Sequence, residues 1–207
     1  MEDVLEVYAR PYDPDNPVVC MDESPKQLVS ELRQPYMDKH GVKYEDSEYK
    51  REGATELVMI NEPLGNRREV RVEDNHNGIT WAVIIAYIVE QMYPDAKLIT
   101  LVMDNLSSHK IYNLYKVFEP KRARTIMKRL EIVYTPKHGS WLNIAECELS
   151  VLSRQALQKR FATIEEVKEQ VETWAKNRNN MQKGVDWQFT AQDARVKLKK
   201  IYPTVLI

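Results

Sequence analysis

The chain has 207 residues, 43% of them hydrophobic, which is enough for one ordinary core, and no shift in composition argues for two large domains. Lys and Arg number 30 against 31 Asp and Glu, so net charge alone does not indicate a nucleic-acid partner. The longest apolar run, residues 79–89, is too short to span a bilayer and no signal peptide opens the chain, so we expect a soluble, intracellular protein without membrane contact.

The first third of the chain predicts a helix, a linker and three strands. Residues 3–9 are helix-like and a proline-rich linker follows, after which the apolar run 18–21 predicts a buried strand that ends on Asp22. Polar residues 31–55 have weak periodicity, and we interpret them as a long loop with little core. Two further strands, joined by Gly65-Asn66 in a plausible hairpin, are expected at residues 56–61 and 68–73.

The middle of the chain alternates helical and extended patterns. We expect, in order, an apolar helix, a buried strand, two helices and a short strand, at residues 78–93, 97–103, 109–118, 122–130 and 131–134. A proline ends the first of these helices, and another separates the next two. The buried strand ends on Asp104, which repeats the pattern at Asp22.

The segment that follows predicts a tight loop and a helix that carries a carboxylate. Ser140 is a favourable N-cap for this helix. Apolar residues recur along it at helical spacing and mark its core-facing side: Leu142, Ala145, Leu149, Leu152 and Ala156. Glu146 lies at the border of that stripe, so we expect its carboxylate to be half-sheltered and to point over a sheet edge.

Two more helices are predicted after residue 163. An amphipathic stripe from Ile164 to Trp174 favours packing onto the same domain over dimerisation. Thr190 with Asp193 is typical of a capping box at the start of a last, basic helix. The whole order of elements fits an α/β fold with a mixed sheet, in which an antiparallel meander is followed by parallel strands joined by helical crossovers.

Three acids occupy matched places in this scheme. Asp22 and Asp104 each end a strand, and Glu146 lies on the helix after the last strand. Any one of them alone is better explained as a turn residue, a helix cap or a surface charge. Together they favour one crevice at the carboxyl ends of the strands, where carboxylates would repel one another unless cations neutralised them. Oxygen-only ligation suits Mg²⁺ or Mn²⁺, and two such ions about 4 Å apart can clamp a phosphodiester displacement.

The sequence around these acids resembles the DDE transposases of the mariner-like superfamily, and most closely their bacterial branch, the insertion-sequence 630 family. The resemblance rests on Val-Val-Cys-Met-Asp-Glu at Asp22, Leu-Val-Met-Asp-Asn-Leu-Ser-Ser-His at Asp104 and Ser-Trp-Leu-Asn-Ile-Ala-Glu at Glu146, and it covers nearly the whole chain. It implies an RNase H-like fold with a mixed five-stranded sheet flanked by helices. It also implies Mg²⁺-dependent cleavage at transposon ends and joining of the 3′ end to target DNA, with Asp22, Asp104 and Glu146 as catalytic metal ligands.

The resemblance also implies a division of the chain. We expect an N-terminal helix and linker at residues 1–16, the catalytic domain at 17–160, and a C-terminal helical extension at 161–207 packed on the same domain. Members of this family carry an N-terminal helix-turn-helix portion that recognises the terminal repeats, and nothing before Asp22 matches one. Such a portion would be missing from this chain or supplied by a separate one. We expect the protein to be bacterial and to lie in the cytoplasm, associated with the nucleoid.

Several neighbours of the acids could bind phosphate or support the ligands: Asn105, His109, Lys137, His138 and Asn143. For His109, helix capping is an equal alternative. Glu148 is a rival third ligand, but it lies about 200° round the helix from Glu146 and should face away. Glu23 points to the opposite strand face from Asp22 and is interpreted as structural.

Other chemistries are less well supported. The two cysteines, Cys20 and Cys147, offer neither a disulfide framework nor metal-ligand spacing, and we interpret both as buried thiols. No Gly-x-Ser-x-Gly elbow is present, and the glutamates beside Cys147 would raise its pKa. Two further functions stay open: a catalytically silent DNA-binding or assembly relic, and a host RNase H-like nuclease. A homodimer is also an open alternative.

Overall fold

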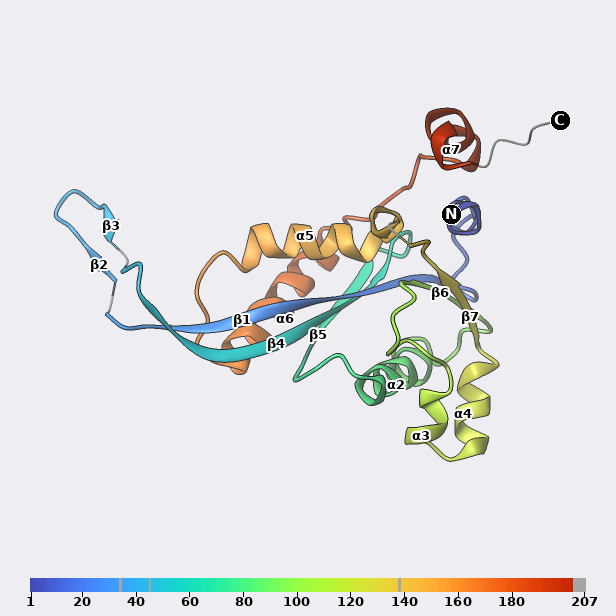
Figure 1. The fold of residues 1–207 in the computed structure, drawn as a ribbon, viewed down its shortest axis with the longest axis horizontal. Coiled ribbons are helices and arrows are strands. Elements are labelled where there is room, and N and C mark those ends of the chain that lie inside the picture. The colour runs from blue at the N-terminus through green and yellow to red at the C-terminus, as the bar shows by residue number, and fades with distance from the viewer. Residues whose placement is uncertain (34, 45, 138, 203–207) are drawn as a thin grey trace.

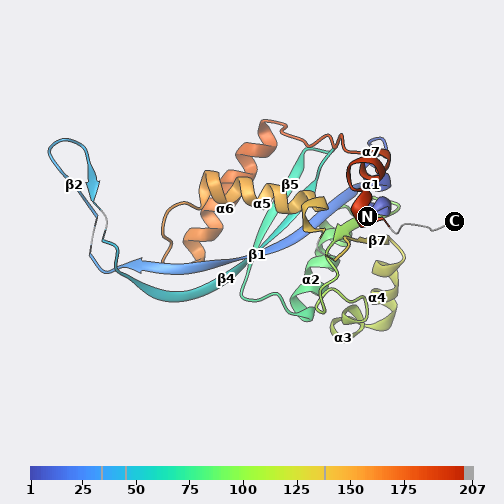
Figure 2. The same cartoon turned by 45° about the horizontal axis from the view of Figure 1, so that its top comes forward.

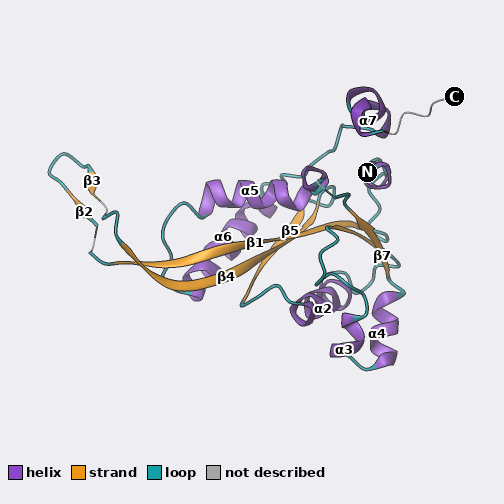
Figure 3. Cartoon of the chain, viewed as in Figure 1, coloured by secondary structure: helices purple, strands orange, loops and turns teal. Residues whose placement is uncertain are grey.

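The computed structural model describes residues 1–33, 35–44, 46–137 and 139–202. Its centre is a sheet of five strands in the order β5-β4-β1-β6-β7 (Figures 1 and 3). The strands are β1 (Val18–Glu31), β4 (Tyr49–Glu62), β5 (Arg67–Glu73), β6 (Ile99–Met103) and β7 (Leu130–Tyr134). β1, β4 and β5 pair antiparallel, whereas β6 pairs parallel with both β1 and β7. The predicted mixed sheet and the hairpin at Gly65-Asn66 are therefore confirmed.

The first strand is much longer than the sequence predicts. It pairs with β6 only as far as Cys20, but it continues beside β4 to the pair formed by Glu31 and Tyr49. Figure 1 shows this two-stranded ribbon projecting from the body of the molecule. At its tip lie β2 (Tyr36–Met37) and β3 (Lys43–Tyr44). The prediction that β1 ends at Asp22 is wrong, and so is the prediction that residues 31–55 are a loop throughout.

Helices cover both faces of the sheet. One face carries α2 (Gly78–Tyr87), a π-helical turn (Ile88–Met92), α3 (Asn113–Val117) and α4 (Pro120–Met127). The other carries α5 (Ile144–Ala156) and α6 (Ile164–Asn180), as Figure 2 shows. The predicted helix at 109–118 is shorter than expected, and Pro120 begins α4 instead of preceding it, because proline lacks only an N–H that the first helical turn leaves unpaired.

The first and last helices lie on the same side of the molecule (Figure 1). Arg195 of α7 (Ala191–Lys197) donates two hydrogen bonds to Glu2 of α1 (Glu2–Tyr8). The predicted capping box of Thr190 and Asp193 is present. A single 3-10 turn (Lys199–Ile201) follows α7. Among the described residues, no helix combines the length and the apolar character needed to cross a bilayer.

Candidate active site

Asp22, Asp104 and Glu146 line one open cavity of about 430 Å³. Asp22 lies on β1, two residues beyond the last residue that pairs with β6. Asp104 directly follows β6, and Glu146 lies in the first turn of α5. The fold therefore brings together acids that are separated by more than half of the chain. Asp22 and Asp104 are half-buried, whereas Glu146 is more exposed than the predicted half-sheltered carboxylate.

The start of α5 is fastened to β1 next to Asp22. Asn143, and not the predicted Ser140, is the N-cap, because residues 140–142 form a separate 3-10 turn. The Asn143 Oδ1 accepts a hydrogen bond from the Ala145 N–H at 3.1 Å, while its Nδ2 donates to the carbonyl of Met21 at 2.9 Å. Both amide atoms of this buried side chain are thus engaged inside the protein, so Asn143 fixes the helix that presents Glu146.

Burial raises the pKa of Asp22 from 3.8 to about 7. The Glu23 N–H donates to its carboxylate at 2.9 Å and opposes the rise, whereas the nearby carboxylates of Asp104, Glu23 and Glu146 add to it. A carboxyl group that is held protonated by burial and by like charges is what a cation would ionise. This electrostatic state fits a divalent-metal site, and the oxygen-only donor set of the three acids suits Mg²⁺ or Mn²⁺.

His109 connects two carboxylates on the other side of Asp104. Its Nδ1 lies 2.7 Å from Oδ1 of Asp104, and its Nε2 lies 2.8 Å from Oε1 of Glu23. Burial alone would lower the pKa of His109, but the two carboxylates outweigh burial and raise it to about 10. The imidazole of His109 is only 1% exposed and lies between two acids, which leaves no room for phosphate binding or helix capping. The third predicted role, support of a ligand, stays a prediction.

The remaining neighbours of the acids differ in where they lie. Asn105 is exposed and accepts a hydrogen bond from Lys110. Lys137 is exposed. His138 lies outside the described residues. Neither Asn105 nor Lys137 is among the residues that line the acid cavity, so a DNA-backbone contact by either remains a prediction.

Glu148 points away from the cavity, as predicted. It is buried and accepts two hydrogen bonds from Arg178 of α6, each of 2.7 Å, and it lies 3.2 Å from the Nε of Arg68 on β5. The interpretation of Cys147 as a buried thiol is wrong, because its position on α5 leaves it exposed. Partial burial and the neighbouring Glu146 and Glu148 nevertheless raise the pKa of this thiol, so it is not activated.

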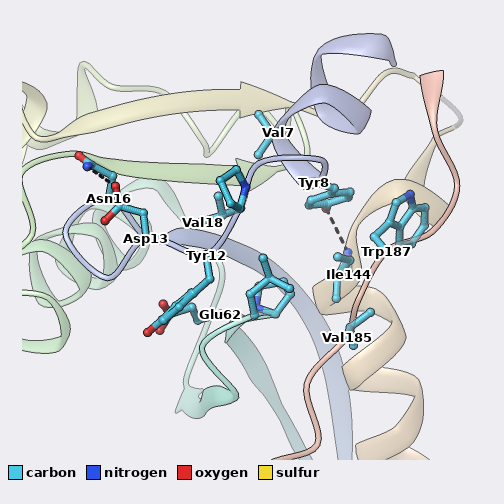
Figure 4. A pocket seen from close by; sticks show the side chains of 13 residues that line it. Val7, Tyr8, Tyr12, Asp13, Asn16, Val18, Glu62, Ile144, Val185 and Trp187 are labelled. Carbon is cyan, nitrogen blue, oxygen red and sulfur yellow. Dashed lines mark hydrogen bonds between the residues drawn. The ribbon is translucent and has the colours of Figure 1, made fainter. Parts of the chain in front are cut away.

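A second, narrow cavity of about 20 Å³ lies between α1, the linker after it and the C-terminal segment (Figure 4). Its walls are largely apolar, with Val7, Val18 and Trp187 among them. Beside it the Tyr8 hydroxyl donates to the carbonyl of Leu142 at 2.7 Å. The N-terminal helix therefore supports the loop that leads into α5. The cavity lacks the three converging acids, so we place the candidate metal centre in the first cavity.

Mn²⁺ is expected to raise the melting temperature more at pH 8 than at pH 6. Between pH 3.8 and about 7 the folded protein holds a proton on Asp22 that the unfolded chain has lost, so the metal-free protein loses stability as the pH rises through this window. Mn²⁺ must displace that proton at pH 6 but not at pH 8. Differential scanning fluorimetry with and without Mn²⁺ measures the difference. Equal Mn²⁺-induced shifts at the two pH values would show that Asp22 does not ionise on metal binding.

The order of the sheet and the position of its helices define an RNase H-like catalytic fold with three acids at one cavity. Comparison with solved structures supports this class. The Mos1 mariner paired-end complex with Mn superposes with a TM-score of 0.57 at 18% identity, and the match covers 88% of this chain and 54% of that chain. For the Mos1 strand transfer complex the TM-score is 0.60 at 16% identity, with the same coverage of 88% and 54%. This chain thus spans about half the length of those transposase chains.

Residues 17–168 match the family model of the DDE superfamily endonucleases. The chain therefore belongs to the family of DDE superfamily endonucleases. No curated protein matches the sequence.

Proposed function

We propose that this chain is the catalytic domain of a mariner-like transposase of the bacterial insertion-sequence 630 branch, which cleaves DNA at transposon ends and transfers the 3′ end to target DNA. The observation that carries the proposal is the position of Asp22, Asp104 and Glu146 around one cavity. Membership of the DDE endonuclease family supports the same chemistry. The half-length match to Mos1 supports the view that end recognition resides in a further portion of the protein or in a separate chain.

In this proposal the three carboxylates hold two divalent cations, Mg²⁺ or Mn²⁺. When bound, such cations lower the pKa of the attacking water or 3′-hydroxyl and stabilise the leaving oxygen. The protein's own residues position the reactants. Asn143 anchors the helix of Glu146 to β1, and the Glu23 N–H orients the carboxylate of Asp22. The open cavity leaves room for a DNA strand beside these acids.

Cleavage of a labelled DNA duplex carrying the element's own terminal repeat tests this function. We expect strand cleavage with Mn²⁺ or Mg²⁺ and none with EDTA, and we expect the products to carry 3′-hydroxyl ends. The same assay with an RNA–DNA hybrid separates this function from that of a host RNase H-like nuclease, which would prefer the hybrid. A melting temperature that Mn²⁺ and Mg²⁺ leave unchanged, together with no cleavage of either substrate, would identify a catalytically silent relic.

A further inference from the structure

We propose that Glu23 and His109 form a positioning pair that fixes the carboxylate of Asp104 for metal binding. The inference rests on the proposed function, because it assigns Asp104 as a metal ligand. It adds Glu23 of β1, which lines the same cavity as the three acids, and His109 of the loop after β6, and neither needs to touch metal or DNA. In this arrangement Glu23 holds the imidazole of His109, and the imidazole holds Asp104.

The contacts of Asp104 show why it needs such support. It follows the last residue of β6, its side chain is 35% exposed, and the hydrogen bond that its Oδ1 accepts from the Leu106 N–H is long, at 3.4 Å. The torsion that turns a carboxylate about its last bond has a broad energy profile, so an unsupported carboxylate samples many orientations. His109 restricts this freedom, because its Nδ1 lies 2.7 Å from Oδ1 of Asp104 and 3.1 Å from the main-chain carbonyl of the same residue.

The imidazole itself is fixed from several sides. Its ring stacks on Trp81 of α2, with centroids 6.1 Å apart and planes 26° apart. The Tyr134 hydroxyl donates to the main-chain carbonyl of His109 at 3.0 Å. Glu23 is bound to Nε2 through Oε1, while its buried Oε2 has no hydrogen-bond partner among the described residues. Glu23 therefore directs its bound oxygen at His109, and His109 has little freedom to turn.

Two other roles fit the same residues less well. Glu23, Asp104 and His109 could together ligate one cation, since their ligand atoms lie within 4.8 Å of one another. A ligating nitrogen cannot also carry the hydrogen that it donates, and both nitrogens of His109 face carboxylate oxygens that only accept. A DNA contact is excluded by the burial of the imidazole, which is 1% exposed. The geometry favours a hydrogen bond from Nε2 to Glu23 and one from Nδ1 to the main-chain carbonyl of Asp104, with the Asp104 carboxylate 2.7 Å from the same nitrogen, and thus a support for the ligand.

His109→Gln is expected to weaken Mn²⁺ binding by about 10–100-fold, which is the typical cost of removing a side chain that orients a metal ligand. Glutamine can reach one of the two carboxylates but cannot bridge both. Isothermal titration with Mn²⁺ measures the dissociation constant without any cleavage. In the cleavage assay we expect more Mn²⁺ to be needed for half of the maximal rate, and we expect high Mn²⁺ to restore most of that rate. His76→Gln is the matched control, since His76 also contacts a carboxylate, that of Glu56, but is 60% exposed.

Glu23→Gln tests the second half of the pair and replaces the first variant if that one does not fold. In the wild-type background we expect Glu23→Gln to weaken Mn²⁺ binding at least threefold. When His109→Gln is already present, we expect adding Glu23→Gln to weaken binding by no more than a further twofold, because Glu23 acts through His109. Unchanged Mn²⁺ affinity in the folded variants overturns the inference. A reduced number of bound ions at unchanged affinity also overturns it, since that result identifies direct ligands.

The variant Asp104→Asn distinguishes an error in the positioning pair from an error in the assignment of the metal centre. If Asp104→Asn abolishes Mn²⁺ binding while the His109 and Glu23 variants bind normally, the positioning pair is wrong and the proposed function stands. If Asp104→Asn binds Mn²⁺ as the wild type does, the assignment of the metal centre fails, and the inference fails with it.

Discussion

Asp22→Asn and Glu146→Gln are each expected to lower the rate of metal-dependent DNA cleavage by about a thousandfold or more, equivalent to ~4 kcal/mol of transition-state stabilisation. Each change removes one negative charge from the cavity that holds the proposed cations and leaves the size of the side chain nearly unchanged. Neither residue is part of the hydrophobic core. The loss should therefore arise from metal and substrate binding, with the fold retained.

The Asp22 variant carries a second signature. Because burial and neighbouring acids raise the pKa of Asp22 to about 7, its ionised form destabilises the metal-free protein above that pH. At pH 8 without metal, Asp22→Asn should therefore melt at a higher temperature than the wild type, although it is inactive. Functional sites commonly show this opposition between stability and activity.

Asp95→Asn is the matched control for these variants. Asp95 is exposed and precedes β6, whereas Asp104 follows it, so the control removes an acid from the opposite end of the same strand. Its cleavage rate should equal that of the wild type. If Asp22→Asn cleaves DNA as fast as the wild type and responds to Mn²⁺ as the wild type does, the assignment of the metal centre to these acids is wrong.

Glu148→Ala is expected to destabilise the protein by ~3–5 kcal/mol, because it leaves buried positive charge without its partner. The side chain of Arg68 is 0% exposed and that of Arg178 is 18% exposed. Glu148 is the acid placed between them. The same contacts join α5 to β5 and α6, and Glu148 lies two residues beyond Glu146, so the network also sets the rotation of the helix that presents Glu146.

Urea denaturation followed by circular dichroism measures this loss. Cys147→Ala is the control: it changes an exposed neighbour on the same helix and should stay within about 0.5 kcal/mol of the wild type. A loss below about 1 kcal/mol in Glu148→Ala would mean that Arg68 and Arg178 find other acceptors, and that the orientation of α5 depends on its apolar packing alone.

The sheet could be predicted because its signals are local. The apolar runs that became β6 and the start of β1 are buried on both faces, and Gly65-Asn66 marks the hairpin, where Asn66 adopts a left-handed conformation with φ of 55°. The stripe on α5 likewise predicted which side faces the core. The convergence of the three acids followed from the topology, because parallel strands bring their carboxyl ends to one edge.

The ribbon could not be predicted in the same way. Beyond the body of the sheet, residues 49–54 of β4 are exposed throughout, so no alternation of apolar and polar residues marks them as a strand. Pro25 also argues against a strand, but at this position β1 has lost its parallel neighbour β6, so a residue without an N–H is tolerated. Main-chain pairing with β4, and not burial, defines this part of β1.

The partners of the predicted supporting residues could not be predicted, for a different reason. Glu23 and His109 are 86 positions apart, and their hydrogen bond depends on how the loop after β6 folds back over α2. The same holds for Asn143, whose link to Met21 spans 122 positions. A charged residue at the border of a predicted strand was the available signal for Glu23. That His109 is the partner of Glu23 could be seen only in the three-dimensional structure.

The three acids and the contacts that hold them come from distant parts of the chain. Asp22 is synthesised early and Glu146 much later. Arg178, which donates hydrogen bonds to Glu148 on the helix of Glu146, is synthesised later still. A nascent polypeptide that has not yet reached α5 cannot bring the three acids together. The candidate metal centre can therefore form only after α5 and the α6 residue that holds it have been synthesised.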